Sequence, residues 1–233
     1  MGTVVQEIRR VQCFGKILEK QGKYTESSEA LTEAQEQFIK IGEPLGAAQC
    51  LQRLGVILHM QNKYSEASEA LTEAQEQFIK IGEPLGVAKC SQSLGNILCM
   101  KSKYSEASEA LTEAQEQFIK IGEPLGAAQC SQSLGNILHM QSKYSEASEA
   151  LTEAQEQFIK IGEPVGAAQC SQSLGDILYM QRKYSEASEV LTEAQEQFIK
   201  IGEPLGAAQC SQRLGDILHM QSQHPEVSEA LTK

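Results

Sequence analysis

The chain has 233 residues, of which 41% are hydrophobic and 22% are charged, a composition typical of a folded protein. The formal net charge is −11 and no stretch concentrates Lys and Arg, so binding to nucleic acid or to an anionic membrane surface is not expected. The sequence contains neither a run of 18 apolar residues nor a secretory signal, which excludes a membrane span or export by that route.

An internal repeat dominates the sequence. The segment that begins Tyr-Ser-Glu-Ala-Ser recurs every 40 residues, at Tyr64, Tyr104, Tyr144 and Tyr184, with a variant at Tyr24. A fixed period between 20 and 50 residues is typical of an array of stacked supersecondary units. We therefore expect a single array over residues 1–233, with repeats at about 1–41, 42–81, 82–121, 122–161, 162–201 and a truncated 202–233.

Each repeat is predicted to contain two helices, A and B. Residues 1–20 form the first A helix, and B begins near Tyr24 and ends near Ile41. In the next B helix the apolar residues from Tyr64 to Ile81 are spaced by three and four, which makes one helical stripe. Gly-Glu-Pro at 82–84 ends that helix and begins the next, with Glu83 as a candidate N-cap and Pro84 at the first helical position.

The following A helix is expected to run from about Pro84 to Met100, with Gly95 in its middle. Glycine inside a helix costs about 1 kcal/mol relative to Ala, so its recurrence indicates close approach of a partner helix. The last copy of B begins at His224 and stops at Lys233. The expected fold class is all-α, a right-handed solenoid of stacked antiparallel hairpins.

The repeat resembles the tetratricopeptide repeat. The matching residues in one copy are Leu134-Gly135 in helix A, then Tyr144, Ala147, Leu151 and Ala154 in helix B. The copies depart from that family in two ways. The position near the start of helix A that is aromatic in the family is serine here, at Ser91, Ser131, Ser171 and Ser211, and the period is 40 residues rather than 34. The long form resembles the arrays of Pins-type scaffolds and of NACHT- or NB-ARC-associated proteins. That resemblance implies binding of a protein or peptide partner, or sensing of a ligand.

Differences between the copies concentrate on one polar face of helix A. Two columns three residues apart vary, and a Gln column lies four residues before the first of them. In the proteins that this chain resembles, that face lines a concave groove. The predicted groove residues are Gln52, Val56, His59, Gln92, Asn96, Cys99, Gln132, Asn136, His139, Gln172, Asp176, Tyr179, Gln212, Asp216 and His219. Drift in a recently duplicated array is the alternative explanation of this variation.

Catalytic and metal sites are not expected. The column His59, Cys99, His139 and His219 offers metal-ligating side chains, but helices one repeat apart lie about 10 Å apart, too far for a shared zinc ion. Motifs for phosphate binding, for a zinc protease and for a nucleophile elbow are all missing from the sequence. We expect no cofactor and no catalytic residue.

Five of the seven cysteines occupy one column: Cys50, Cys90, Cys130, Cys170 and Cys210. The spacing between repeats is too long for disulfides within the column, so these are expected to be small buried residues in a reducing, cytoplasmic compartment.

These observations favour a non-catalytic interaction scaffold that binds a peptide or a partner helix on the helix A face. A structural spacer, which self-associates head to tail through uncapped ends, is the alternative. The near-identity of the copies is also compatible with an engineered, consensus-like array.

Overall fold

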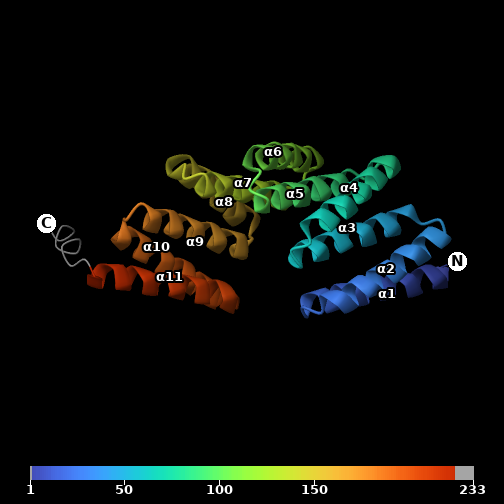
Figure 1. The fold of residues 1–233 in the computed structure, drawn as a ribbon, viewed down its shortest axis with the longest axis horizontal. Helices are drawn as coiled ribbons and strands as arrows, with labels where there is room; N and C mark the ends of the chain where they lie inside the picture. The colour runs from blue at the N-terminus through green and yellow to red at the C-terminus, as the bar shows by residue number, and fades with distance from the viewer. Residues whose placement is uncertain (1, 224–233) are drawn as a thin grey trace. The chain divides into compact units, whose positions relative to one another are not determined.

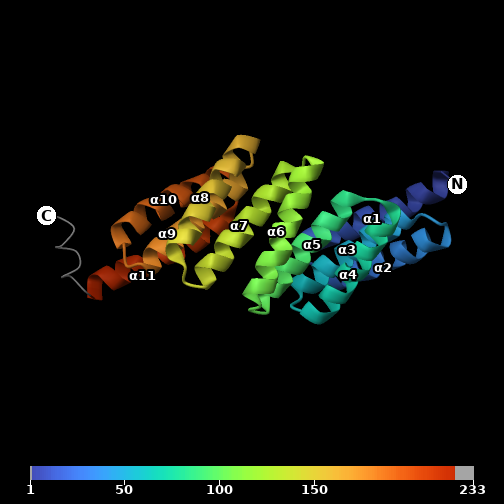
Figure 2. The ribbon, with the colours of Figure 1, turned by 90° about the horizontal axis from the view of Figure 1, so that it is seen from above.

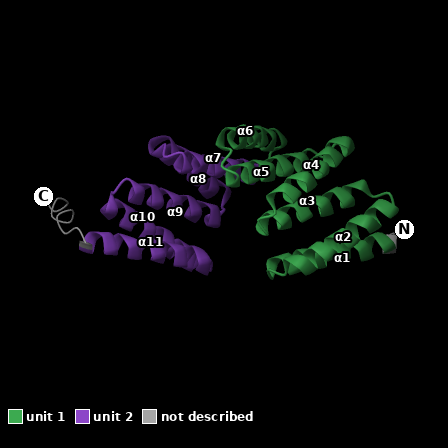
Figure 3. Cartoon of the chain, viewed as in Figure 1, with its two compact units in different colours: residues 1–122 green, residues 123–233 purple. Residues whose placement is uncertain are grey.

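The computed structural model describes residues 2–223 and separates into two compact units, residues 1–122 and 123–233 (Figure 3). Unit 1 contains α1 (Gly2–Lys20), α2 (Tyr24–Lys40), α3 (Pro44–Met60), α4 (Tyr64–Ile81), α5 (Pro84–Met100) and α6 (Tyr104–Ile121). Unit 2 contains α7 (Pro124–Met140), α8 (Tyr144–Ile161), α9 (Pro164–Met180), α10 (Tyr184–Ile201) and α11 (Pro204–Gln223). Within each unit successive helices pack side by side as antiparallel hairpins (Figures 1 and 2). The all-α fold of stacked hairpins is confirmed for the described residues. The expected helix after His224 lies outside them.

The turn from helix A to helix B is a tight left-handed turn. After α1 the left-handed residue is Gly22, with φ of 72°, but the later copies place Asn62, Ser102, Ser142 or Arg182 there, with φ between 59° and 62°. The Lys63 N–H donates to Leu58 O at 2.9 Å, which closes the end of α3. A left-handed residue costs about 1–2 kcal/mol unless it is glycine, so the flanking hairpin stabilises this conformation.

The turn from helix B to the next helix A is closed by backbone groups. Gly82 has φ of 71°, and the N–H of Glu83 donates to Phe78 O at 2.9 Å. Glu83 is the N-cap residue of α5 as expected, but its side chain makes no capping hydrogen bond. Its backbone instead completes the end of the preceding helix, as in a Schellman turn.

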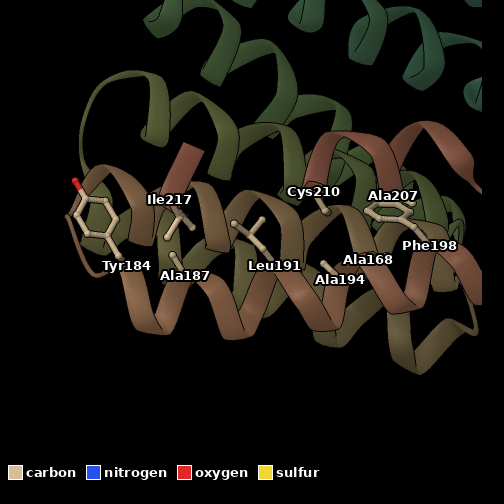
Figure 4. Close-up of a cluster of buried hydrophobic side chains, with 9 residues drawn as sticks. All are labelled: Ala168, Tyr184, Ala187, Leu191, Ala194, Phe198, Ala207, Cys210 and Ile217. Carbon is tan, nitrogen blue, oxygen red and sulfur yellow. The ribbon is translucent and has the colours of Figure 1, made fainter. Parts of the chain in front are cut away.

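The core of each unit lies between a B helix and the two A helices beside it. In unit 2, the buried stripe Ala187, Leu191, Ala194 and Phe198 of α10 packs against α9 and α11, as Figure 4 shows. In unit 1, the corresponding stripe of α4 packs against α3 and α5. The carboxylates that the stripe excludes, Glu66, Glu69, Glu73 and Glu76, are all exposed as expected.

Two glycines of helix A allow the neighbouring B helices to approach. A Cβ added at Gly175 would lie 2.6 Å from Leu191 Cγ, and one at Gly166 would lie 2.4 Å from Phe158 Cδ1. The close approach expected at the mid-helix glycine is therefore confirmed. The contact at the Gly166 position was not anticipated, although Gly recurs there in five copies.

Serine replaces the aromatic residue of helix A without leaving an unpaired polar group. Gln155 Nε2 of α8 donates to Ser171 Oγ at 2.7 Å, and Gln75 of α4 makes the same bond to Ser91 at 2.8 Å. Ser171 in turn donates to Ala167 O at 3.2 Å. At the position where the family has an aromatic residue, helix B and the next helix A are thus joined by a glutamine–serine hydrogen bond.

Candidate functional site: the polar face of the A helices

The predicted groove residues lie on one face of each A helix, one turn apart. In unit 1 all six, on α3 and α5, are half-buried, and so are the six on α7 and α9 in unit 2. On α11, Asp216 is half-buried, whereas Gln212 and His219 are exposed. Neighbouring A helices within a unit, α3 with α5, α7 with α9 and α9 with α11, are in contact, so their polar faces adjoin.

The residues of the second variable column lie against helix B. The ring centroids of His59 and Tyr64 are 5.8 Å apart, and those of His139 and Tyr144 are 6.0 Å apart. Tyr179 packs in the same way on Tyr184, at 5.7 Å. These tilted arrangements are favourable for aromatic rings. Each ring is therefore fixed by its own hairpin and presents only its remaining face to the A-helix surface.

A polar pocket of about 250 Å³ lies between α9 and α11 in unit 2, lined by Gln172, Asp176, Gln209, Gln212, Arg213 and Asp216. Arg213 is its central group. Its Nε donates to Asp176 Oδ1 at 2.6 Å, a second nitrogen donates to Asp216 Oδ2 at 3.3 Å, and its guanidinium lies 4.9 Å from the ring centroid of Tyr179. One guanidinium thus connects three of the predicted groove residues on two adjacent helices.

Charge and burial act together around Arg213. Burial alone would lower its pKa, but the hydrogen bond and charge of Asp176 raise the pKa overall. Burial lowers the pKa of His139, with Asp176 raising it and Arg213 lowering it to a smaller extent. The pKa of His59 is also lowered by burial. Both imidazoles are therefore neutral hydrogen-bonding groups at pH 7.

Several polar side chains of this face were missed by sequence reasoning. Gln132 Nε2 donates to Gln169 Oε1 at 3.3 Å, and Gln172 to Gln209 at 3.2 Å. In unit 1, Arg53 donates to Glu19 Oε2 at 2.8 Å. The sequence did contain a sign of these ion pairs. Arg53 and Arg213 stand three residues after Cys50 and Cys210, at a position that is serine in the middle repeats.

The chain also carries side chains of the metal-ligating and thiol types. Over residues 2–223 no three His, Cys, Asp or Glu side chains gather as metal ligands would. The seven cysteines are free, and burial raises the pKa of the five in the column to about 11 or 12. None of the described helices is long and apolar enough to cross a membrane.

Comparison with solved structures shows the same fold in several proteins. The Rap conjugation gene regulator of plasmid pLS20, solved with the Phr* peptide, is 17% identical, with a TM-score of 0.76 over 93% of this chain and 64% of that one. A signal transduction ATPase with a tetratricopeptide repeat sensor, from Pyrococcus horikoshii, is 18% identical, with a TM-score of 0.73 over 86% of this chain and 31% of that one. Nearly identical tetratricopeptide-like repeats from Podosopora anserina are 15% identical, with a TM-score of 0.62 over 84% of this chain and 97% of that one.

The first two of these proteins are longer than this chain, which spans less than two thirds of either. No curated protein sequence matches the chain. The family model for the tetratricopeptide repeat matches residues 7–80 and 88–160, which is more than half of the sequence. With its paired helices, its Leu-Gly and Tyr-x-x-Ala positions and this match, the chain belongs to the tetratricopeptide repeat family.

Proposed function

We propose that this protein is a non-catalytic scaffold that binds an extended peptide or a partner helix on the polar face of its A helices. The observation that carries the proposal is the pocket of unit 2, because four of its six lining residues, Gln172, Asp176, Gln212 and Asp216, belong to the helix face that the sequence predicted. Amide and carboxylate groups held on rigid helices are well suited to hydrogen bonds with the backbone of a bound peptide.

Two further observations support the proposal. Most polar residues of this face are half-buried and several are held by neighbours, so binding would order few additional side chains and lose little conformational entropy. Two structures with the same fold were solved with a bound factor, namely a Rap protein with the competence and sporulation factor and the Rap regulator with the Phr* peptide. The binding of a peptide by this chain is inferred from its own residues together with that likeness.

Affinity selection with two baits tests the proposal. One bait is the native chain, and the other carries Asn96→Arg, Asn136→Arg and Asp176→Arg, with its helicity checked by circular dichroism. A third bait with Glu66→Arg, Glu106→Arg and Glu146→Arg changes charge on exposed B-helix positions and is the matched control. We expect a peptide selected on the native chain to bind the control and to be lost by the A-helix variant. Equal retention by all three baits would contradict groove binding.

Self-association is a second candidate, favoured by exposed apolar side chains on α1 and α11. Phe14 and Ile17 of α1 are 55% and 53% exposed, and Leu205 and Leu218 of α11 are 70% and 67% exposed. Contact between two such different surfaces would be heterologous and would extend into chains. Light scattering over a concentration series tests it. A mass that grows with concentration and returns to the monomer value in Leu218→Glu is expected, and a constant monomer mass would reject it.

A further inference from the structure

A second surface recurs in both units and shares no residue with the A-helix face. In unit 2 a pocket of about 520 Å³ lies where α8 ends, α9 begins and α10 ends, lined by Ile159, Pro164, Ala167, Lys200 and Ile201 with two glutamines, a glycine and Glu163. In unit 1 the residues at the corresponding positions, from Ile39 to Ile81, line a pocket of about 300 Å³. Eight of the nine lining positions of the unit 2 pocket thus also line the pocket of unit 1.

Ile159 and Pro164 of this pocket are exposed although they belong to well-packed helices, while Ile201 is half-buried and Ala167 is buried. Ile159 is 64% exposed, and its counterparts in the other B helices are 60–64% exposed. Burying an aliphatic side chain stabilises a protein, so apolar side chains left in water around a pocket favour an interaction there. Ala167 and Ile201 also contribute to the core, whereas the fold does not use Ile159, since Phe158 and Ala154 already fill the core side of α8.

Nearly all of the pocket positions are unchanged between copies, the exception being Val87 at the position of Ala167, whereas the polar face of helix A varies. The segment Phe-Ile-Lys-Ile-Gly-Glu-Pro is identical at 38–44, 78–84, 118–124, 158–164 and 198–204. Its isoleucine at the second position and its lysine at the third are exposed, where packing would tolerate most residues. Drift alone would change such positions as readily as it changed Cys99 or Tyr179.

The charge around the pocket indicates the kind of partner. Within one helical turn of the apolar floor in unit 2 there are more carboxylates than ammonium groups: Glu156, Glu163, Glu196 and Glu203 against Lys160 and Lys200. All six are exposed, and the chain as a whole carries −11. Complementary charge favours a partner with basic side chains beside its apolar ones.

We propose that this pocket binds a basic amphipathic helix of a partner protein. An apolar side chain of that helix would enter the space between Ile159 and Ile201, with a second one, a turn away, over Pro164 and Ala167. Lysine or arginine residues flanking them would reach the carboxylates at the rim. Apolar anchors spaced by three and four residues with a charged opposite face are the usual form of a helix bound in a groove. The pocket recurs along the array, which adds avidity for a partner with several such helices.

The test uses a fluorescein-labelled, 18-residue synthetic peptide with Leu on one helical face and Lys on the other. Its Kd for the full chain is measured by fluorescence anisotropy at 50 and 300 mM salt. A five-site variant replaces each exposed isoleucine by serine, at Ile39, Ile79, Ile119, Ile159 and Ile199. Loss of one apolar contact of this size corresponds to about a tenfold weaker Kd or more. Because these side chains are exposed, the variant should keep its helicity by circular dichroism.

Three controls make the outcome decisive. Asn96→Ala with Asn136→Ala changes the A-helix face without changing charge and should leave the Kd unchanged. A peptide with Ala in place of Leu should bind at least about tenfold more weakly to the native chain, a comparison that does not depend on the folding of any variant. A peptide with Glu in place of Lys should not bind. An unchanged Kd for the serine variant or for the Ala peptide, or equal binding of the Glu peptide, would overturn the proposal.

Discussion

Two glycines in the same local sequence, Leu-Gly-Asp-Ile-Leu, provide a sharp test of the packing. Gly175 in α9 is buried, and an added Cβ would lie 2.6 Å from Leu191 Cγ and 2.7 Å from its Cδ2. Gly215 in α11 is exposed, and among the described residues no atom lies within 4 Å of an added Cβ. Alanine has the higher helix propensity at both positions, so the two variants differ chiefly in steric contact.

The magnitudes follow from these contacts. Replacing a mid-helix glycine by alanine stabilises a helix by about 0.5–1 kcal/mol, which is the expected gain in Gly215→Ala. At Gly175 the same gain is opposed by overpacking, because Leu191 is 0% exposed and has little room to retreat. Overpacking a core costs about 1–3 kcal/mol. Gly175→Ala should therefore be less stable than Gly215→Ala by about 1–3 kcal/mol.

Urea unfolding of both variants and of the native chain, followed by circular dichroism, measures this difference. The urea concentration at the midpoint of each transition is compared together with the steepness of that transition, since a long repeat array can unfold in more than one step. Helicity in buffer should be the same in all three proteins. Equal midpoints for the two variants, or a stabilised Gly175→Ala, would refute the inference that Gly175 is required for the approach of α10.

Further predictions concern the core, the ion pair and the thiols. Phe158→Ala should lower the free energy of unfolding by about 3–5 kcal/mol, whereas Glu156→Ala, on the exposed side of the same helix, should change it by less than about 0.5 kcal/mol; urea melts that give equal losses would contradict the assigned stripe. Arg213→Ser, which installs the serine of the middle repeats, should cost about 1 kcal/mol in the same assay because Asp176 loses its partner, and Asp176→Asn in that background should restore part of the loss. In the folded protein the pKa values of the five column thiols are raised to about 11 or 12 from the ordinary value of 9.0. Their contribution to the free energy of unfolding is therefore complete below pH 9 and is lost as the pH rises toward 12. At pH 10 the loss is about 1 kcal/mol per thiol. Urea midpoints at pH 7.5 and pH 10 should fall less in a variant with alanine at all five positions, and an equal fall would contradict this linkage.

Most of the fold could be predicted from the sequence because the signals agree and recur. The stripe from Tyr64 to Ile81, the Gly-Glu-Pro boundary and the mid-helix glycine each occur five times or more, and the helix ends at Pro84, Met100 and Ile81 match the predicted ones. The N-cap position of Glu83 was predicted, but its backbone bond to Phe78 was not, because local sequence does not distinguish a side-chain cap from a backbone bond. The hydrogen bond between Gln155 and Ser171 was also missed, since it joins residues of different helices.

The candidate site could be predicted only in outline. Periodicity places Gln172, Asp176 and Tyr179 on one helix face, but it does not show that Arg213 of the next A helix crosses to contact two of them. Nor does it reveal that His139 packs on Tyr144, because that contact depends on the geometry of the turn between them. The apolar pocket at Ile159 was missed because one exposed isoleucine in a polar helix carries no signal by itself.

The contact between the phenylalanine of helix B and the glycine of the next helix A, here called the joint, has a consequence for the evolution of this protein. Phe78 lies against Gly86 in unit 1, and Phe158 lies against Gly166 in unit 2, in the same way and with the same residues. These joints within the two units are therefore interchangeable, and a recombination event that exchanges one for the other in register produces no new kind of joint. The array can therefore gain or lose one whole repeat at a time while the cores of the remaining repeats stay filled. The number of binding surfaces can then change during evolution, with each intermediate protein still able to fold.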